Sequence, residues 1–407
     1  MKLATALLDT GVERALESLR DKVSAPIAID LWDGRSFPLG PAPAVRLKVP
    51  QASSLKYLVR PTLGHLAEAF VEGELDVEGS LRDVMRSADA LVTSGNSSAW
   101  QRVATAAVRH TRKLDREAIH RHYDVSNEFY GLWLDRRMVY SCAYFRTGEE
   151  DIDTAQEQKL DHICRKLRLQ PGEKFLDIGC GWGGLIVHAA QHYGVDATGI
   201  TLSQNQFDLA RERIAAAGLQ DRCRVALRDY RDQDGDGTFD KIASVGMFEH
   251  VGLRNLPVYF GTAYRLLRDR GLFLNHGITS SDVDNREIGS DTGRFIDKYV
   301  FPHGELPHVA LALREMSAAG FEVSDVESLR PHYAKTLEHW SDRLEARLDD
   351  ALKLVDAKTL RVWRVYLMGC AYGFQQGWMS IHQLLGSKQQ EPGLTELPLT
   401  REFMYPR

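Results

Sequence analysis

The chain has 407 residues, of which 43% are hydrophobic and 26% charged, and its formal net charge is -5. This length suggests two domains, and this composition can bury full cores, which excludes general disorder. No run of ~18 uncharged apolar residues occurs, which argues against a membrane-spanning helix. Asp9 and Glu13 interrupt the apolar N-terminal stretch, which therefore reads as an amphipathic helix and not as a signal peptide. The five cysteines show neither CxxC spacing nor a disulfide framework, so we expect a reducing compartment and no metal site.

A basic cluster stands out against the acidic total. Arg109, Arg112, Lys113, Arg116 and Arg121 fall within thirteen residues. A solvated helix face explains such a run, and so does a contact surface for anionic phosphate groups. No nucleic-acid motif accompanies the cluster. We therefore expect a lipid surface as its partner and no nucleic acid.

The first 100 residues mix short strands and helices. Strands are expected over 27–32 and 45–49, separated by a turn segment rich in glycine and proline. Short amphipathic helices are expected over 63–70 and 81–92. The stretch 93–100, TSGNSSAW, is the first plausible linker.

From about residue 170 the pattern changes to an alternation of strands and helices. It predicts a mainly parallel sheet with helices on both faces and a ligand site at the carboxyl ends of the strands. The segment 279–308 reads as an insertion over that edge, and long helices are expected over 337–354 and 359–385. The expected strands are 175–178, 196–200, 223–227, 240–245 and 272–276, and the expected helices are 184–192, 205–217 and 256–267.

A glycine-rich turn follows the first of these strands. Gly179, Gly181 and Gly184 satisfy the G-x-G-x-x-G pattern of dinucleotide sites. A nicotinamide site would also need an acidic residue at the end of the second strand, where this chain has Thr201. Asp177, two residues before the first glycine, can anchor a cationic amino-acid group or orient the loop. The pattern favours S-adenosylmethionine over a nicotinamide cofactor, with a tight turn that binds nothing as the alternative.

Several longer motifs carry a family resemblance. The chain resembles the cyclopropane-fatty-acyl-phospholipid synthases and the related mycolic-acid cyclopropane synthases and fatty-acid C-methyltransferases. The resemblance implies a class I S-adenosylmethionine-dependent methyltransferase, a Rossmann-like α/β domain, over 116–407. It also implies a smaller N-terminal α+β domain over 1–115 that binds lipid or membrane. The motifs are HYDVSNEFY (122–130), YSCAYF (140–145), LDIGCGWGG (176–184), GITLS (199–203), DYRD (229–232), SVGMFEHVG (244–252) and KYVFP (298–302).

The same resemblance implies which residues hold the cofactor. Thr201 and Gln206 would supply the hydrogen bonds to the ribose, and Tyr230 would stack on adenine. The residues that the resemblance implies are Tyr140, Ser141, Gly179, Gly181, Thr201, Gln206, Tyr230 and Arg231. Asp177 joins this set because of its place before the glycine-rich turn.

For catalysis, the resemblance implies a bound bicarbonate ion as the general base. Glu249 would accept the proton of bicarbonate, while His276, Cys142, Tyr333 and the backbone amide of Ile278 would donate to its oxygens. Glu249 and His276 follow predicted strands, where a ligand site belongs. Purely structural roles are the alternatives: a core histidine, a helix-terminal glutamate and a small buried cysteine.

Cys370 also matches a position of the family. It is expected in the middle of a helix on an apolar face, where burial would raise the pKa of its thiol. We therefore expect it to line the site and not to react.

Three functions remain open at this point. The first is cyclopropanation of unsaturated phospholipid acyl chains. The second is methyl transfer to the same chains, giving a methyl or methylene branch, and the third is lipid binding on a vestigial methyltransferase fold. For the enzyme we expect a cytoplasmic homodimer that meets the inner face of the membrane peripherally.

Overall fold

The computed structural model describes residues 16–17, 20, 25–59, 61–95, 125–284, 292–299, 305–389 and 397–405. The chain divides into two compact units. The first comprises Met1–Val103, Ile288–Val300 and Asp356–Tyr372, and the second comprises the remaining residues. The predicted domain boundary at residue 115 and the basic cluster at 109–121 lie outside the described residues.

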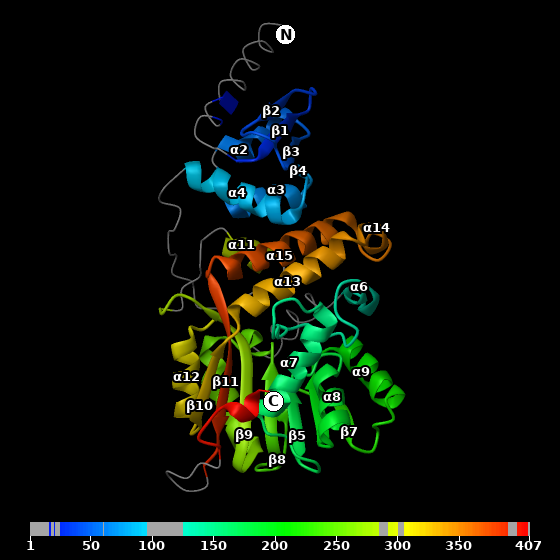
Figure 1. Ribbon diagram of the computed structural model, residues 1–407, viewed down its shortest axis with the longest axis vertical. Coiled ribbons are helices and arrows are strands. Elements are labelled where there is room, and N and C mark those ends of the chain that lie inside the picture. The colour runs from blue at the N-terminus through cyan, green and yellow to red at the C-terminus, as the bar shows by residue number, and fades with distance from the viewer. Residues whose placement is uncertain are drawn as a thin grey trace. The chain divides into compact units, whose positions relative to one another are not determined.

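The first unit is built on a four-stranded sheet with the order β2-β1-β3-β4 (Figure 1). β1 and β3 are parallel, whereas β2 and β4 pair with them antiparallel. Both predicted strands and both predicted helices are present, but the expected linker starts inside α4. The elements are β1 (Ile27–Leu31), β2 (Ser36–Pro38), β3 (Val45–Val49), η1 (Ala52–Leu55), α2 (Lys56–Val59), α3 (Leu63–Val71), β4 (Asp76–Glu78), α4 (Leu81–Gly95) and α11 (Thr292–Tyr299).

Contacts to α3 and α4 explain why Asp356–Tyr372 belongs to this unit. The guanidinium of Arg361 donates to the carbonyl oxygen of Phe70 at 2.8 Å and lies 4.7 Å from the centroid of its ring. The hydroxyl of Tyr372 donates to Asp89 at 2.8 Å. The sequence analysis assigned this segment to the domain over 116–407.

The second unit contains a seven-stranded sheet with the order β10-β11-β9-β8-β5-β6-β7. The five strands from β9 to β7 are parallel, and β11 is antiparallel to both of its neighbours. The predicted mainly parallel sheet is therefore confirmed, and β10 and β7 form its opposite edges (Figure 1). The strands are β5 (Lys174–Ile178), β6 (Asp196–Thr201), β7 (Cys223–Leu227), β8 (Phe239–Val245), β9 (Leu267–Ser280), β10 (Glu322–Ser328) and β11 (Met379–Ser387).

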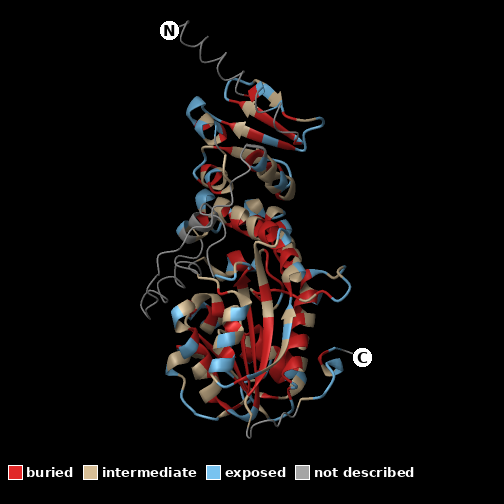
Figure 2. Ribbon diagram, turned by 90° about the vertical axis from the view of Figure 1, so that its left-hand side faces the viewer, coloured by how far each residue is buried: buried red, intermediate tan, exposed pale blue. Residues whose placement is uncertain are grey.

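Alternate residues of the central strands pack into two separate apolar cores, one on each face of the sheet. Phe175 and Ala243 pack on one face with α7 and α8, while Leu176 and Ile242 pack on the other with α10 and α12. Figure 2 shows the buried strands between the helices. The remaining elements are α6 (Asn127–Gly131), α7 (Ile152–Lys166), α8 (Gly184–Tyr193), α9 (Gln204–Ala216), η2 (Tyr230–Asp232), η3 (Phe248–His250), η4 (Leu253–Asn255), α10 (Leu256–Leu266), α12 (Val309–Ala318), α13 (Arg330–Glu345), α14 (Leu348–Ala351), α15 (Ala357–Gln375) and η5 (Glu402–Met404).

Two of the predicted long helices are wrong in part. The helix expected over 359–385 ends at Gln375, and the residues beyond it form β11. Gly377 takes a φ of 72°, which stops the helix and turns the chain into the strand. The helix expected over 337–354 is two helices, α13 and α14. In the described part of the chain, no helix is long and apolar enough to cross a bilayer.

One face of α7 is polar and nevertheless buried. Gln156, Lys159, His162 and Lys166 recur at spacings of three or four residues and are at most 3% exposed. The ammonium of Lys166 lies 2.9 Å from a carboxylate oxygen of Asp325, and 2.6 Å from one of Glu327. Buried charges need such partners, so this face fixes α7 against β10.

His162 ties a further segment to the same cluster. Its Nδ1 lies 3.2 Å from the carbonyl oxygen of Met404, and its Nε2 lies 2.8 Å from a carboxylate oxygen of Glu327. Both partners are acceptors, so both bonds form together only when both ring nitrogens carry a hydrogen. Arg401 adds an ion pair with Asp325 at 2.8 Å. Residues 397–405 are thereby held on α7.

Glu327 should make folding stability sensitive to acid. The hydrogen bond with His162 and the charge of Lys166 outweigh burial and lower the pKa of Glu327 to about 2. A lowered pKa contributes stability above the ordinary carboxyl value, and that stability is lost as the pH falls towards about 2. We expect Glu327→Gln to lower the free energy of unfolding at neutral pH by on the order of 3 kcal/mol.

The measurement is thermal unfolding between about pH 3 and pH 7. The deficit of Glu327→Gln should shrink as the pH falls below the ordinary carboxyl pKa of 4.5, because the wild-type carboxyl then takes up a proton in the unfolded state and not in the folded state. Glu322→Gln, an exposed position on the same strand, is the matched control and should stay close to wild type. A deficit of constant size across this range would contradict the assignment.

Candidate functional site

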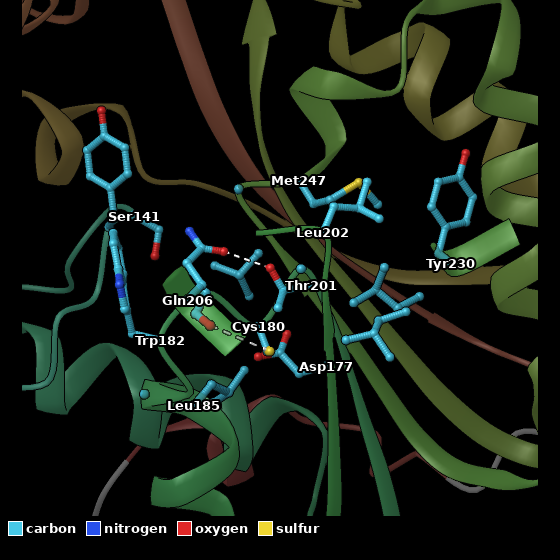
Figure 3. A pocket seen from close by; sticks show the side chains of 18 of the residues that line it. Ser141, Asp177, Cys180, Trp182, Leu185, Thr201, Leu202, Gln206, Tyr230 and Met247 are labelled. Carbon is cyan, nitrogen blue, oxygen red and sulfur yellow. Dashed lines mark hydrogen bonds between the residues drawn. The ribbon is translucent and has the colours of Figure 1, made fainter. Parts of the chain in front are cut away.

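A pocket opens at the carboxyl ends of β5, β6 and β8, where the strand order reverses. It gathers every residue that the sequence analysis assigned to the cofactor. Figure 3 shows Ser141 and Tyr230 on opposite sides of this pocket. The predicted residues that line it are Tyr140, Ser141, Asp177, Gly179, Gly181, Thr201, Gln206, Tyr230 and Arg231.

The glycine-rich turn forms the floor of the pocket because its backbone needs glycine. Gly179 has a φ of 84°, and a Cβ atom there would come within 2.8 Å of Cβ of Met247. Gly181 has a φ of 53°, and nothing lies within 4 Å of the place where its Cβ would stand. The first glycine thus allows close packing, and the second leaves open space for a ligand.

Asp177 is buried at the end of β5, where it lines the pocket. Its Oδ1 has no hydrogen-bond partner among the described residues. Burial raises the pKa of this carboxyl to about 7, against the opposing charge of Lys159. A cationic group in the pocket would therefore find an unsatisfied acceptor here.

Thr201 and Gln206 are bonded to each other across the start of α9. The hydroxyl of Thr201 donates to Oε1 of Gln206 at 2.7 Å (Figure 3). This bond fixes the amide, whose nitrogen remains as a donor. On the far side of the pocket, Arg231 pairs with both carboxylate oxygens of Asp229, at 2.9 and 2.7 Å, and lies 5.4 Å from the ring centroid of Tyr230.

Tyr140 and Ser141 are fixed from behind. The ring of Tyr140 packs in an aromatic cluster with Trp133 and Trp340, at centroid distances of 5.5 and 5.3 Å. The backbone oxygen of Ser141 accepts from the Gln156 amide, and its hydroxyl accepts from the Lys159 ammonium, both at 2.8 Å.

Glu249 lies in η3, between the pocket-lining residues Met247 and His250. Its Oε1 accepts from the backbone amide of Ile278 at 2.7 Å, and its Oε2 is buried without a hydrogen-bond partner in the described chain. Burial raises its pKa to about 7, against the opposing effect of the Ile278 amide. The amide expected to bind an anion directly is thus bonded to Glu249.

His276 lies within β9, not at the end of its strand as the sequence suggested, and pairs with Gln383 of β11. The amide nitrogen of Gln383 lies 3.2 Å from Nδ1. As an amide donor it makes Nδ1 the acceptor, which places the hydrogen of the neutral ring on Nε2. Burial holds the pKa of His276 well below its usual value, so the ring is neutral. Nε2 is buried and has no partner in the described residues.

Hydrogen bonds through Leu329 connect Cys142 and Tyr333 to the same end of the sheet. The carbonyl oxygen of Leu329 accepts from the amide of Tyr333 at 3.0 Å and lies 3.9 Å from the Cys142 sulfur. The backbone amide of Leu329 donates to the carbonyl oxygen of Ile381, and Ile381 of β11 pairs with Ile278 of β9. Burial raises the pKa of Cys142, so its thiol is a neutral, weak donor.

Cys370 lies in α15 and belongs to the first unit. Desolvation raises the pKa of its thiol to about 12. The thiol is therefore protonated at neutral pH and is a poor nucleophile, as its surroundings in the sequence suggested.

Sequence reasoning missed several residues that line the pocket, among them Lys159, Trp182 and Met247. Lys159 was missed because α7 carries polar and apolar residues at similar spacing, and spacing alone does not tell which face is buried. Trp182 and Met247 lie inside the quoted motifs and line the pocket beside the predicted residues. The indole of Trp182 donates to Asn127 at 2.7 Å, which joins the glycine-rich turn to α6.

Comparisons with known proteins identify the family. Residues 110–384 match the family model "Mycolic acid cyclopropane synthetase", and residues 16–97 match a domain of unknown function, DUF7884. A "Probable fatty acid methyltransferase" of Pseudomonas putida is 49% identical over 96% of this chain and 98% of its own. The "Cyclopropane-fatty-acyl-phospholipid synthase" of Escherichia coli K12 is 37% identical over 67% of this chain and 68% of its own.

Solved structures give the same relationship. A mycolic acid cyclopropane synthase in complex with SAH and CTAB is 36% identical, with a TM-score of 0.63, over 67% of this chain and 98% of its own. The predicted methyltransferase fold is thereby confirmed. The chain belongs to the mycolic acid cyclopropane synthetase family and is an S-adenosylmethionine-dependent methyltransferase.

Proposed function

We propose that this protein transfers a methylene carbon from S-adenosylmethionine to a cis double bond of an unsaturated phospholipid acyl chain, forming a cyclopropane ring. The observation that carries the proposal is a pair of buried atoms without partners in the described chain, Oε2 of Glu249 and Nε2 of His276. A buried polar atom without a partner costs free energy. Their presence beside the methyltransferase pocket supports a step that needs an additional polar group.

An isolated alkene is a weak nucleophile, so positioning and exclusion of water must supply most of the rate. When bound, S-adenosylmethionine supplies the electrophilic methyl group. Gly181 leaves room for it. The Thr201–Gln206 pair and Tyr230 would bind its adenosine part. The aromatic rings of Trp133 and Trp340 pack behind Tyr140 and support that wall of the pocket.

Closure of the ring also requires that a proton leave the added carbon. The residues present fit a bicarbonate ion, which would supply the base when bound. Oε2 of Glu249 can accept the hydrogen of bicarbonate, and Nε2 of His276 can donate to one of its oxygens. Cys142 and Tyr333 are further donors in this proposal, as the family resemblance implies.

The second candidate is methyl transfer to the same acyl chains with a methyl or methylene branch as the product. The 49% identity to a protein named as a probable fatty acid methyltransferase favours it. The two reactions share the cofactor and the first bond formed. They differ in which proton leaves and in whether a reduction follows.

Product analysis tests the choice. Purified protein, S-adenosylmethionine and vesicles of an unsaturated phosphatidylglycerol should yield acyl chains heavier by one CH2 group. We expect NMR of the released methyl esters to show cyclopropane ring hydrogens. A vinylidene signal or a methyl branch would establish the second candidate, and the absence of any product would support a lipid-binding role.

Glu249 should be required for turnover and not for cofactor binding. Glu249→Gln keeps the size and one acceptor but loses the charge, so turnover should fall ~10²-fold or more. Because the carboxylate must be ionised to accept a proton, the wild-type rate should rise through about pH 7, the pKa of Glu249. The variant should lose this rise. Rates are measured at constant bicarbonate, and affinity for S-adenosylhomocysteine is measured by calorimetry.

Two controls accompany this variant. Glu212→Gln, exposed on α9, should keep both the rate and the pH profile. Removal of dissolved carbonate should slow the wild type, and added bicarbonate should restore it. Full turnover by Glu249→Gln, or a wild type indifferent to carbonate, would show that the proton leaves by another route.

We also propose that the protein works from the cytoplasm as a homodimer bound peripherally to the inner face of the membrane. The support is the basic cluster at 109–121 together with a bilayer lipid as substrate. Vesicles with anionic lipid should bind the protein, and salt should weaken binding because charges are screened over about 10 Å at roughly 0.1 M salt. Replacing Arg109, Arg112, Lys113 and Arg116 by Gln should abolish this difference. Equal sedimentation with neutral vesicles would contradict the proposal.

A further inference from the structure

Lys159 is a buried cation in the wall of the methyltransferase pocket. Its side chain lies on the polar face of α7, is 1% exposed and lines the pocket. The ammonium donates to the hydroxyl of Ser141 at 2.8 Å. An ammonium carries three donors, and a buried one is costly unless its donors and its charge are matched.

The acidic residues that act on Lys159 electrostatically do not complete the hydrogen bonds of its ammonium. Asp135 and Asp177 both act on Lys159 electrostatically. The carboxylate of Asp135 accepts from the backbone amides of Arg137 and Val139, both at 2.8 Å. Oδ1 of Asp177 has no hydrogen-bond partner in the described residues. The pocket therefore presents an ammonium with unused donors and a carboxylate oxygen without a donor.

This pair of opposite groups matches one part of S-adenosylmethionine. The amino-acid end of that molecule carries a carboxylate and an ammonium on one carbon. We propose that Lys159 binds the carboxylate of this end while Asp177 faces its ammonium, so that Lys159 determines the specificity for the amino-acid part of the cofactor. The inference rests on the proposed binding of the cofactor in this pocket.

The charges are consistent with a cationic ligand. A lone lysine would repel the sulfonium, but Lys159 and Asp177 add no net charge to the pocket when both are charged. Burial lowers the pKa of Lys159 to about 8, and burial raises that of Asp177 to about 7. A carboxylate beside Lys159 and an ammonium beside Asp177 would favour the charged form of each. Affinity for a ligand with the amino-acid end should fall above about pH 8, as Lys159 loses its proton.

Two ligands separate this role from a structural one. S-adenosylhomocysteine contains the amino-acid end, whereas 5′-methylthioadenosine has the same adenosine and thioether without it. Lys159→Met keeps the length and removes the charge. We expect it to weaken S-adenosylhomocysteine by about 10- to 100-fold, the loss of one charged hydrogen bond, and to leave 5′-methylthioadenosine unchanged. Calorimetry on the full chain gives both affinities, and only the first should depend on pH above about 8.

Lys166→Met is the matched control. Lys166 is buried on the same face of α7 but does not line the pocket, so its loss should lower the unfolding temperature and leave both affinities unchanged. Equal weakening of both ligands by Lys159→Met, or unchanged affinity for S-adenosylhomocysteine, would overturn the inference alone. If the wild type does not bind 5′-methylthioadenosine, the pocket assignment fails and the inference fails with it.

Discussion

The burial of polar groups on α7 is the constraint on which the second unit depends. A helix that places an amide, two ammonium groups and an imidazole inside a protein must meet a partner at each of them. Those partners come from the segment around Ser141, from β10 and from residues 397–405, which are far apart in the chain. Satisfying α7 therefore fixes one wall of the pocket and one edge of the sheet together.

The pocket and the proposed catalytic atoms both leave buried polar atoms without partners. In the pocket, the Thr201–Gln206 pair is satisfied within the protein, but Oδ1 of Asp177 has no partner in the described chain. At Glu249 and His276, one polar atom of each side chain is also buried without a partner there. The free-energy cost of burying these atoms is offset only when a polar ligand binds. The proposed cofactor would meet the first of them, and the proposed anion would meet the other two.

Features that leave a local pattern in the sequence were predicted, whereas features that depend on contacts between distant residues were not. The buried parallel strands are short apolar runs between turns, so their positions along the chain could be predicted. The glycine-rich turn is recognisable because its backbone requires glycine. β11 was mistaken for helix because Leu384 and Leu385 are both buried, on opposite faces of the sheet, and such a run has no period of two. Lys159 was missed because nothing local distinguishes a buried lysine from a solvated one.

The placement of β11 has a consequence for the order in which this protein matures. Every residue that lines the pocket lies between Met138 and Val251. All the lining residues are therefore present once this stretch has been synthesised. The hydrogen on His276, in contrast, is set by Gln383, which joins its neighbouring strand more than a hundred residues later. Pairings of such sequence separation form slowly. A nascent chain therefore contains every pocket-lining residue before it contains β10, Gln383 and residues 397–405, the later segments that hold α7 and His276 in place.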